Sequence, residues 1–257
     1  MSDRRMQDLA AAGFGAMGAL YERVRPDYPR AAVEILVREL GIARGTVVVD
    51  VGAGTGKLTR SLTPTGATVI AVEPLADMRE RLIQTAPRAV PFDGTAEAMP
   101  LRDGSADAIV CAQAFHWFDG PRALAEFHRV LKPGGGVGLM WNVRDTRVDW
   151  VARLEKIIAS VEPERPDHQT GKWRAAWDAT ELFAPLDLRT VTNSQVLSSE
   201  GVVERVASVS SVAVLAPPER DAIFARVRDL LAAHPETLGR DEVELPYRTE
   251  VYLSRRR

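Results

Sequence analysis

The chain has 257 residues, of which 46% are hydrophobic and 26% are charged, a balance typical of a globular protein with a sizeable core. Its formal net charge is -2 and its pI is about 6.1, so it lacks the overall positive field that holds nucleic acid or an anionic membrane. We therefore expect neither nucleic acid nor a membrane as a partner.

The first half of the chain alternates amphipathic helices with short apolar strands. In chain order, the pattern predicts a helix at 31–40, a strand at 46–51, a helix from about Lys57, a strand at 68–72, a helix at 75–85, a strand at 106–112, a helix at 121–131 and a strand at 136–142. Strands separated by helices indicate a parallel sheet whose right-handed crossovers bury both faces.

After residue 142 the pattern changes. Charged, tryptophan-containing sequence at 144–184 precedes a predicted strand at 188–197, two helical stretches at 201–209 and 218–233, and an alternating strand at 243–253. The first half therefore predicts an α/β core, and the second half predicts an addition to it.

A glycine-rich turn follows the first strand. The run Val48 to Val51 leads directly into Gly52-Ala53-Gly54-Thr55-Gly56, where glycines permit positive φ and let a ligand approach the main chain. Glu73 ends the next strand, 21 positions after Gly52. Ligands of such sheets bind at the carboxyl ends of the strands, and an acid at this place can accept both hydroxyls of a ribose.

The spacing separates three kinds of nucleotide site. A P-loop needs a glycine at position 51 and Ser or Thr at position 58, but the chain has Val51 and Leu58. A dinucleotide fingerprint needs a glycine where Lys57 stands, and it has no use for Asp50 two residues before the first glycine. A cofactor with an ammonium group and no pyrophosphate gives Asp50 a role, through an ordered water or the local amide network.

These residues resemble the first motif of the class I S-adenosylmethionine-dependent methyltransferases, and Glu73 matches the ribose-binding acid of that family. The segment 94–101 followed by 103–110 resembles the third motif, whose loop surrounds the adenine, and 131–135 resembles the stretch before the fifth strand. Many relatives have an Asp where this chain has Thr95, so we expect the Ala96 backbone amide to contact the base.

The resemblance implies a Rossmann-like seven-stranded methyltransferase sheet, mostly parallel with an antiparallel last strand, with helices on both faces and a small helical cap. It implies S-adenosylmethionine as cofactor and S-adenosylhomocysteine as product. The cofactor-binding residues that it implies are Asp50, Gly52, Ala53, Gly54, Gly56, Glu73, Pro74, Met78, Thr95, Ala96, Gln113, Ala114 and Arg25.

Further marks resemble a small-molecule branch of the family that includes trans-aconitate-type enzymes: Phe14, Tyr21, the segment 25–29 and the segment 113–119. This resemblance implies an N-terminal cap over the cofactor at 1–30, with Tyr21 near the sulfonium and Arg25 pairing its carboxylate. It also implies a cofactor-binding core at 31–143, a variable substrate-recognition or lid region at 144–240, and the last core strand with a basic tail at 241–257.

Methyl transfer from a sulfonium is a direct displacement, so an enzyme needs chiefly to align the reactants and exclude water. We expect an oxygen or sulfur nucleophile of a small molecule as acceptor. His116 and Tyr21 are the catalytic candidates, because either can orient an acceptor or take its proton. His116 fits equally well a histidine that packs and shapes the site. Trp117, Trp141 and Asn142 are the predicted substrate-binding residues.

His128, His168 and His234 show no ligand-like spacing, and we interpret them as structural; likewise we predict no metal. Cys111 is the only cysteine, which favours a reducing compartment, and no segment is typical of a signal peptide or a membrane span. We expect a cytoplasmic monomer or homodimer. A nucleotide-dependent oxidoreductase and a non-catalytic S-adenosylmethionine-binding protein remain the alternatives.

Overall fold

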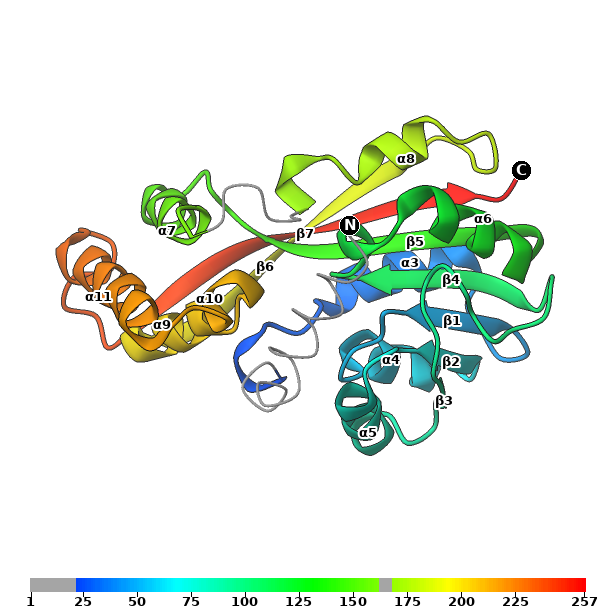
Figure 1. The fold of residues 1–257 in the computed structure, drawn as a ribbon, viewed down its shortest axis with the longest axis horizontal. Helices are drawn as coiled ribbons and strands as arrows, with labels where there is room; N and C mark the ends of the chain where they lie inside the picture. Colours follow the sequence, from blue (N-terminus) through cyan, green and yellow to red (C-terminus); the bar gives the residue numbers. More distant parts are fainter. Residues whose placement is uncertain (1–21, 162–167) are drawn as a thin grey trace. The chain divides into compact units, whose positions relative to one another are not determined.

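A seven-stranded sheet carries the fold in the computed structural model, which describes residues 22–161 and 168–257. The strand order is β3-β2-β1-β4-β5-β7-β6, the sheet is mixed, and β7 is antiparallel to its neighbours (Figure 1). The strands are β1 (Val47–Val51), β2 (Thr68–Val72), β3 (Val90–Phe92), β4 (Ala106–Ala112), β5 (Leu131–Arg144), β6 (Asp187–Ser198) and β7 (Glu242–Arg255). This arrangement confirms the predicted fold class.

The first of the named helices precedes the first strand, and the others connect consecutive strands. They are α3 (Arg30–Leu40), α4 (Lys57–Leu62), α5 (Ala76–Thr85), α6 (Gly120–Val130), α7 (Asp149–Ala159), α8 (Arg174–Asp178), α9 (Ser199–Ala207), α10 (Ser210–Ala213) and α11 (Pro217–Ala233). Single 3-10 turns lie at η1 (Thr63–Thr65), η2 (Phe115–Trp117) and η3 (His168–Thr170). Local chemistry sets several ends: the Asp119 carboxylate accepts from the Arg122 amide at the start of α6, and Gly41 ends α3 in the left-handed conformation.

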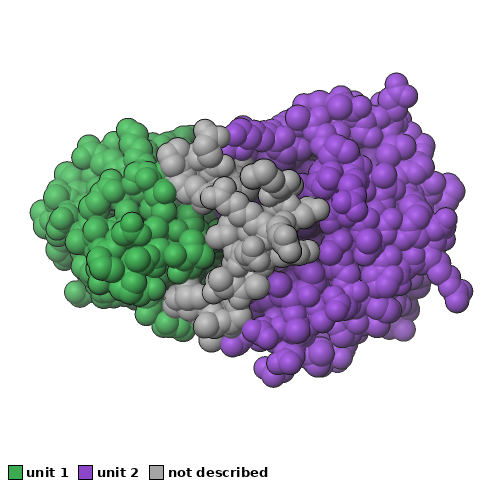
Figure 2. Space-filling view, in the orientation of Figure 1, with its two compact units in different colours: residues 1–26, 143–165, 192–248 green, residues 27–142, 166–191, 249–257 purple. Residues whose placement is uncertain are grey.

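The chain divides into two compact units (Figure 2). Unit 1 comprises 1–26, 143–165 and 192–248, and unit 2 comprises 27–142, 166–191 and 249–257. Three of the boundaries fall within β5, β6 and β7, so these long strands contribute residues to both units. Each unit has its own apolar core, and each is described separately below.

The core of unit 2 lies between the parallel strands and the first helices. Leu36 and Leu40 of α3 and Leu58 and Leu62 of α4 are buried against the strands. A side chain at Gly138 of β5 would collide with Leu36, so that glycine is what allows α3 to lie close to the sheet. These contacts hold the carboxyl ends of β1, β2 and β4 in fixed register, with Asp50 opposite both Ala71 and Val110.

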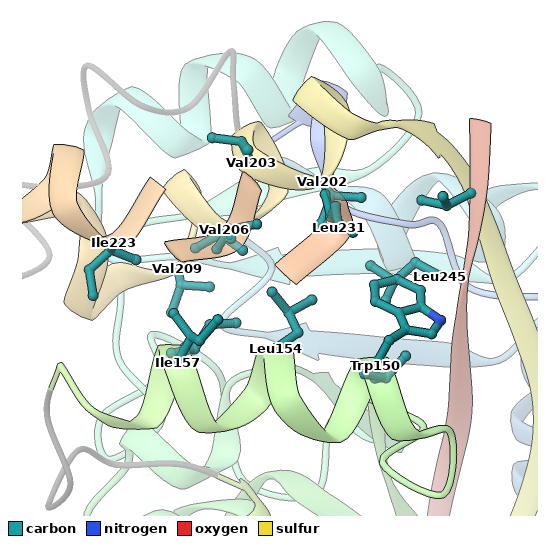
Figure 3. Packing of buried hydrophobic residues seen from close by; sticks show 14 of the residues in the cluster. Trp150, Leu154, Ile157, Val202, Val203, Val206, Val209, Ile223, Leu231 and Leu245 are labelled. Carbon is teal, nitrogen blue, oxygen red and sulfur yellow. The ribbon is translucent and has the colours of Figure 1, made fainter. Parts of the chain in front are cut away.

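The core of unit 1 is helical. Leu154 and Ile157 of α7 face Val202 and Val206 of α9, and Leu231 of α11 closes the cluster (Figure 3). Burial of such side chains stabilises each by roughly 1.5–3 kcal/mol relative to exposure. Unit 1 therefore has a packed core of its own.

Most predicted elements agree with the structure to within a few residues, and the strands at 68–72 and 106–112 match to the residue. The strand β3 was not expected, because it has three residues, contains Pro91 and lies at the sheet edge, where the hydrophobic pattern is weakest. The helices α7 and α8 were not expected either, since tryptophans and charges obscure the periodicity of 144–184.

Candidate functional site

The turn after β1 contains three glycines with positive φ, and their surroundings differ. A Cβ on Gly52 (φ 67°) would lie 2.8 Å from the Ala114 Cβ, and one on Gly56 (φ 87°) would lie 2.9 Å from the Thr85 hydroxyl oxygen. A Cβ on Gly54 (φ 57°) would meet nothing within 4 Å. The outer glycines therefore let the turn pack on its neighbours, whereas Gly54 borders open space at the carboxyl end of β1.

Glu73 is bound to this turn. Its Oε2 accepts a hydrogen bond from the Gly54 amide at 2.9 Å, and its Oε1 accepts one from the Leu75 amide at 3.0 Å. The side chain is buried, and this desolvation raises the pKa of Glu73 although the two amide hydrogen bonds act to lower it. One carboxylate therefore ties the β1 turn to the end of β2, and each of its oxygens keeps a lone pair for a further donor.

Asp50 lies beneath the same turn and is almost fully buried. Its Oδ2 accepts a hydrogen bond from the Thr59 hydroxyl at 2.6 Å, but its Oδ1 has no partner among the described residues. Burial, opposed by the Thr59 hydrogen bond and assisted by the charge of Glu73, raises its pKa to about 7. A buried acceptor without a donor is costly, so a ligand or a water that donates to Oδ1 would bind favourably here.

The raised pKa of Asp50 predicts a specific pH dependence of stability. Its folded-state pKa of about 7 exceeds the ordinary 3.8, so the stability that the protonated group contributes is complete below about pH 4 and is lost as the pH rises through 7. Asp50→Asn cannot ionise, so the variant should gain on the wild type between pH 4 and pH 8, by on the order of 4 kcal/mol. Urea denaturation at several pH values measures this, and parallel curves for the two proteins would contradict it.

The segment before α3 is docked on α4 by charge. The Asp27 carboxylate accepts from Lys57 Nζ at 3.0 Å and from Arg60 Nη2 at 2.6 Å. Partial burial raises the pKa of Asp27, but these two cations outweigh it and hold the pKa below its ordinary range. Lys57, which excluded a dinucleotide fingerprint, thus serves to hold 27–29 beside the glycine turn.

The loop after β4 contains a strained residue. Gln113 has φ 57° and is the one non-glycine residue with positive φ in the part of the chain that the structure describes. Its amide donates to the Met140 carbonyl at 2.8 Å, and its Nε2 donates to the Asn142 carbonyl at 3.1 Å. A side chain in this region costs of order 1–3 kcal/mol and persists where its surroundings demand it, typically at functional sites.

Other predicted cofactor contacts lie on the neighbouring loops. Thr95 and Ala98 exchange two backbone hydrogen bonds of 3.3 Å, which turn the loop so that Ala96 is buried. Met78 of α5 is buried, and Pro74 is exposed. The structure thus places Asp50 near the end of β1, and the glycine turn, Glu73, Thr95 and Gln113 on the loops after successive strands of unit 2. Their contacts with a cofactor stay predictions.

His116 follows β4 in η2 and is bonded to Trp141 of β5. The indole Nε1 donates to the His116 Nδ1 at 3.1 Å. An indole N–H can only donate, so Nδ1 must accept, and the ring proton of the neutral imidazole lies on Nε2. His116 therefore presents a donor at Nε2, a chemistry that suits orienting an acceptor better than taking its proton.

Trp141 also packs against a second histidine, His168, for which the sequence predicts only a structural role. The His168 and Trp141 ring centroids are 4.4 Å apart, and His168 Nε2 lies 3.3 Å from Glu250 Oε2. The Tyr252 hydroxyl donates to the same oxygen at 2.8 Å. Burial, with the Glu250 hydrogen bond, raises the pKa of Tyr252 above its usual range, so its hydroxyl stays a donor.

These rings form one group, the Trp141 cluster, which consists of His116, Trp141, His168, Trp173 and Tyr252. Trp173 stacks on His168 with a centroid separation of 5.5 Å, and its indole donates to the His168 carbonyl at 3.1 Å. All five residues and Glu250 belong to unit 2. Their positions span 136 residues of sequence, so no local motif could have found them; the one available signal was the alternating Glu250, Tyr252 pair on the last strand.

Several predicted residues have other surroundings. Tyr21 and Phe14 lie outside the described residues. Arg25 belongs to unit 1, where its Nη2 donates to the Ser208 carbonyl at 2.8 Å. The Asn142 amide donates to the Asp27 carbonyl at 3.2 Å and accepts from the Thr249 hydroxyl at 2.6 Å, which are structural contacts. The substrate or cofactor roles of these residues stay predictions, as does that of Trp117, whose ring lies 5.3 Å from His116.

The described residues contain neither a candidate metal site nor a membrane-spanning helix. Within 22–161 and 168–257, no group of three or more His, Cys, Asp or Glu residues could hold a metal ion. None of the helices in these ranges combines the length and the apolar character that crossing a membrane requires.

Comparison with known proteins agrees with this geometry. The methyltransferase domain family matches residues 49–138, which run from β1 into β5. An uncharacterized methyltransferase of Mycobacterium tuberculosis is 39% identical over 95% of this chain and 95% of its own length. A malonyl-[acyl-carrier protein] O-methyltransferase of Pectobacterium atrosepticum is 31% identical over 52% of this chain and 53% of its own length.

One solved structure of a related protein has a similar fold. A proposed type II methyltransferase from Anaeromyxobacter dehalogenans superimposes with a TM-score of 0.64 and 26% identity, covering 90% of this chain and 96% of the other. The near full-length similarity decides against the oxidoreductase and the non-catalytic alternatives. The chain therefore belongs to the class I S-adenosylmethionine-dependent methyltransferases.

Proposed function

We propose that this enzyme transfers a methyl group from S-adenosylmethionine to an oxygen or sulfur nucleophile of a small-molecule metabolite. The cofactor supplies the electrophilic methyl group when it is bound. The open space beside Gly54 admits a ligand against the main chain, Glu73 offers acceptors for ribose hydroxyls, and the unpartnered Asp50 Oδ1 offers one for an ammonium group or its water. These three features of the β1 turn fit an adenosyl amino acid.

The observation that carries the choice of acceptor is the His168 and Glu250 pair in the Trp141 cluster. An alcohol, phenol or thiol must lose a proton when it is methylated, and a positioned base accelerates this step about 10²- to 10⁴-fold. In this proposal the Glu250 carboxylate stabilises the imidazolium that forms, and the indoles of Trp141 and Trp173 pack against the ring. We assign the role of proton acceptor to His168 on this basis.

His116 takes the complementary role in this proposal. Its Nδ1 is engaged by Trp141, so its Nε2–H donates to the acceptor and orients it. Trp141 lies between the two imidazoles, with ring centroids 6.3 Å from His116 and 4.4 Å from His168. One indole thus fixes both the orienting and the proton-accepting histidine.

The recognition of a particular metabolite belongs to the parts of the chain outside the common core. We assign it to the predicted variable region 144–240 and to the N-terminal cap at 1–30, because loops and insertions on a fixed scaffold usually carry specificity. The O-methyltransferase of Pectobacterium atrosepticum supports an oxygen acceptor for part of this sequence family. The resemblance to trans-aconitate-type enzymes also favours an oxygen acceptor. Membership of that branch remains a proposal.

A screen with radiolabelled methyl donor tests the proposed acceptor. Purified enzyme is incubated with S-adenosyl[methyl-³H]methionine and, separately, with panels of carboxylic acids, phenols, thiols, amines and oligonucleotides. We expect label in the oxygen or sulfur compounds. Transfer confined to amines or oligonucleotides would show that the acceptor class is wrong, although the methyltransferase assignment would stand.

Replacing His168 should discriminate among the acceptors found in this screen. His168→Asn is expected to lower kcat about 100-fold or more for a phenol or thiol, with a smaller change in KM. A carboxylate acceptor has no proton to lose and should be much less affected. His128→Asn replaces a half-buried histidine on α6 that lies outside the Trp141 cluster; it is the matched control and should keep wild-type kinetics. Equal kcat values for His168→Asn and wild type on a phenol would contradict the assignment.

A further inference from the structure

An arginine near the start of α5 joins the loops that follow β2 and β3. The Arg79 Nη1 donates to the Glu73 carbonyl at 2.7 Å, and its Nη2 donates to the Asp93 carboxylate at 3.1 Å. Glu73 directly follows β2 and Asp93 directly follows β3, and all three residues belong to unit 2. One guanidinium therefore bridges the carboxyl ends of two neighbouring strands.

This bridge completes the hydrogen bonding of Glu73. The Glu73 amide donates to the Phe92 carbonyl at 3.1 Å, and its two carboxylate oxygens accept from the Gly54 and Leu75 amides. With the bond from Arg79, the amide, the carbonyl and both carboxylate oxygens of Glu73 are all engaged. The main chain and the side chain are thus both held, so the remaining lone pairs of the carboxylate have fixed directions.

Arg79 also affects the charge of Glu73. Burial is the largest influence and raises the pKa of the Glu73 carboxyl, against the two amide hydrogen bonds. The positive charge of Arg79 lowers this pKa, whereas the negative charge of Asp93 raises it. An ionised carboxylate accepts hydrogen bonds at both oxygens, and protonation removes part of that capacity. Arg79 therefore favours the form of Glu73 that can accept from two hydroxyl groups.

The stability of the fold gives little reason for this arginine. The Arg79 side chain is 19% exposed and that of Asp93 is 73% exposed, so water screens their ion pair. Pairs of this kind contribute little to stability. The two strands are also paired by their own backbones, with Val72 opposite Phe92. What distinguishes Arg79 from an ordinary surface ion pair is its bond to the main chain of Glu73.

We propose that Arg79 is a positioning residue for the cofactor, which holds Glu73 in place for the ribose hydroxyls without touching the ligand itself. This inference rests on the proposed function, because it takes Glu73 as the ribose-binding acid. It implies that Arg79 improves binding only while the Glu73 carboxylate is present. It also implies that Asp93, the other partner of the guanidinium, contributes much less to binding.

The test removes the guanidinium with and without the Glu73 carboxylate. Arg79→Met is compared with wild type, with Glu73→Gln and with the variant that carries both changes. Calorimetry gives the affinity for S-adenosylhomocysteine and for its 2′-deoxy analogue, and urea denaturation without ligand gives the free energy of unfolding. Arg79→Gln, which has no charge and a shorter side chain, replaces the methionine variant in every comparison if the latter does not fold.

Two further variants are matched controls. Arg81→Met removes a half-buried arginine from the same helix, two positions along, so its side chain leaves the helix roughly 200° away from that of Arg79. Asp93→Asn breaks the ion pair but leaves Arg79 to donate to the Glu73 carbonyl. Both variants should bind S-adenosylhomocysteine within about twofold of wild type.

The expected result is a loss of affinity that depends on Glu73. Arg79→Met should weaken S-adenosylhomocysteine about tenfold, which corresponds to about 1.4 kcal/mol of binding free energy. It should weaken the 2′-deoxy analogue less, because that ligand lacks one of the hydroxyls assigned to Glu73. In the Glu73→Gln background the same substitution should change the affinity by about twofold at most, since no carboxylate remains to be positioned.

An equal loss in the wild-type and Glu73→Gln backgrounds would overturn the proposal, because Arg79 would then act independently of Glu73. A loss in Asp93→Asn as large as that in Arg79→Met would also overturn it and assign the effect to the loop after β3. So would unchanged affinity in Arg79→Met, whether or not its stability falls. If Glu73→Gln still weakened the ligand in these cases, the ribose role of Glu73 would survive. Undiminished affinity in Glu73→Gln would instead reject that role, and this inference with it.

Discussion

Gly54→Ala should weaken S-adenosylhomocysteine binding about tenfold or more and leave the fold intact. The new Cβ would meet no protein atom within 4 Å, so it would occupy the space in which we place the cofactor. A steric conflict of about 1.4 kcal/mol already lowers affinity tenfold. Alanine at φ 57° also costs roughly 1–2 kcal/mol of backbone strain, which is a loss of stability and is measured separately.

Gly104→Ala is a matched control for this strain. Gly104 has φ 58°, nearly the same as Gly54, and its Cβ would also meet nothing within 4 Å. It precedes β4, whereas Gly54 follows β1, so the two glycines lie at opposite ends of paired parallel strands. Both variants should lose similar free energy of unfolding in urea. Only Gly54→Ala should lose affinity by calorimetry, and equal affinity of the two variants would place the cofactor elsewhere.

Glu73→Gln should weaken S-adenosylhomocysteine about 10- to 100-fold. The proposal assigns its carboxylate to the ribose hydroxyls, and hydrogen bonds to a charged group are worth about 1.5–3 kcal/mol each. Glutamine keeps one carbonyl oxygen for the Gly54 or Leu75 amide and has no charge. The measurement is calorimetric affinity for S-adenosylhomocysteine and for its 2′-deoxy analogue. Wild type should prefer the natural ligand, and Glu73→Gln should lose most of this preference.

Glu126→Gln controls for the loss of a half-buried carboxylate that holds a loop. The Glu126 carboxylate accepts from the Met99 amide at 2.7 Å and pairs with Arg129. Its replacement should reduce stability and leave the discrimination between the two ligands unchanged. An undiminished preference for the natural ligand in Glu73→Gln would show that Glu73 only supports the turn through its two amide contacts.

Local patterns were sufficient for the α/β core and its glycine turn. The strands at 68–72 and 106–112 are short apolar runs bounded by turn residues, and hydrophobic periodicity alone defines them. Gly52, Gly54 and Gly56 could be identified because few residue types other than glycine are tolerated where a turn needs positive φ. Glu73 could be placed beside them because parallel strands bring their carboxyl ends to one edge of the sheet.

Long-range contacts escaped the same reasoning. His168 has no recognisable spacing to a partner in the sequence, yet the structure places it against Trp141, Glu250 and Tyr252, which come from distant strands. The proton position on His116 depends on the indole of Trp141. No spacing rule connects such residues, because their proximity follows from strand order and helix packing.

Most strands and helices, the glycine turn and the family could be predicted from local sequence, because each depends on residues within one strand-turn-helix unit. The surroundings of individual side chains needed the fold: the buried Asp50 oxygen that has no partner among the described residues, and the two imidazoles beside Trp141. Charge, protonation and hydrogen bonding depend on burial and on through-space neighbours, and the fold alone sets both.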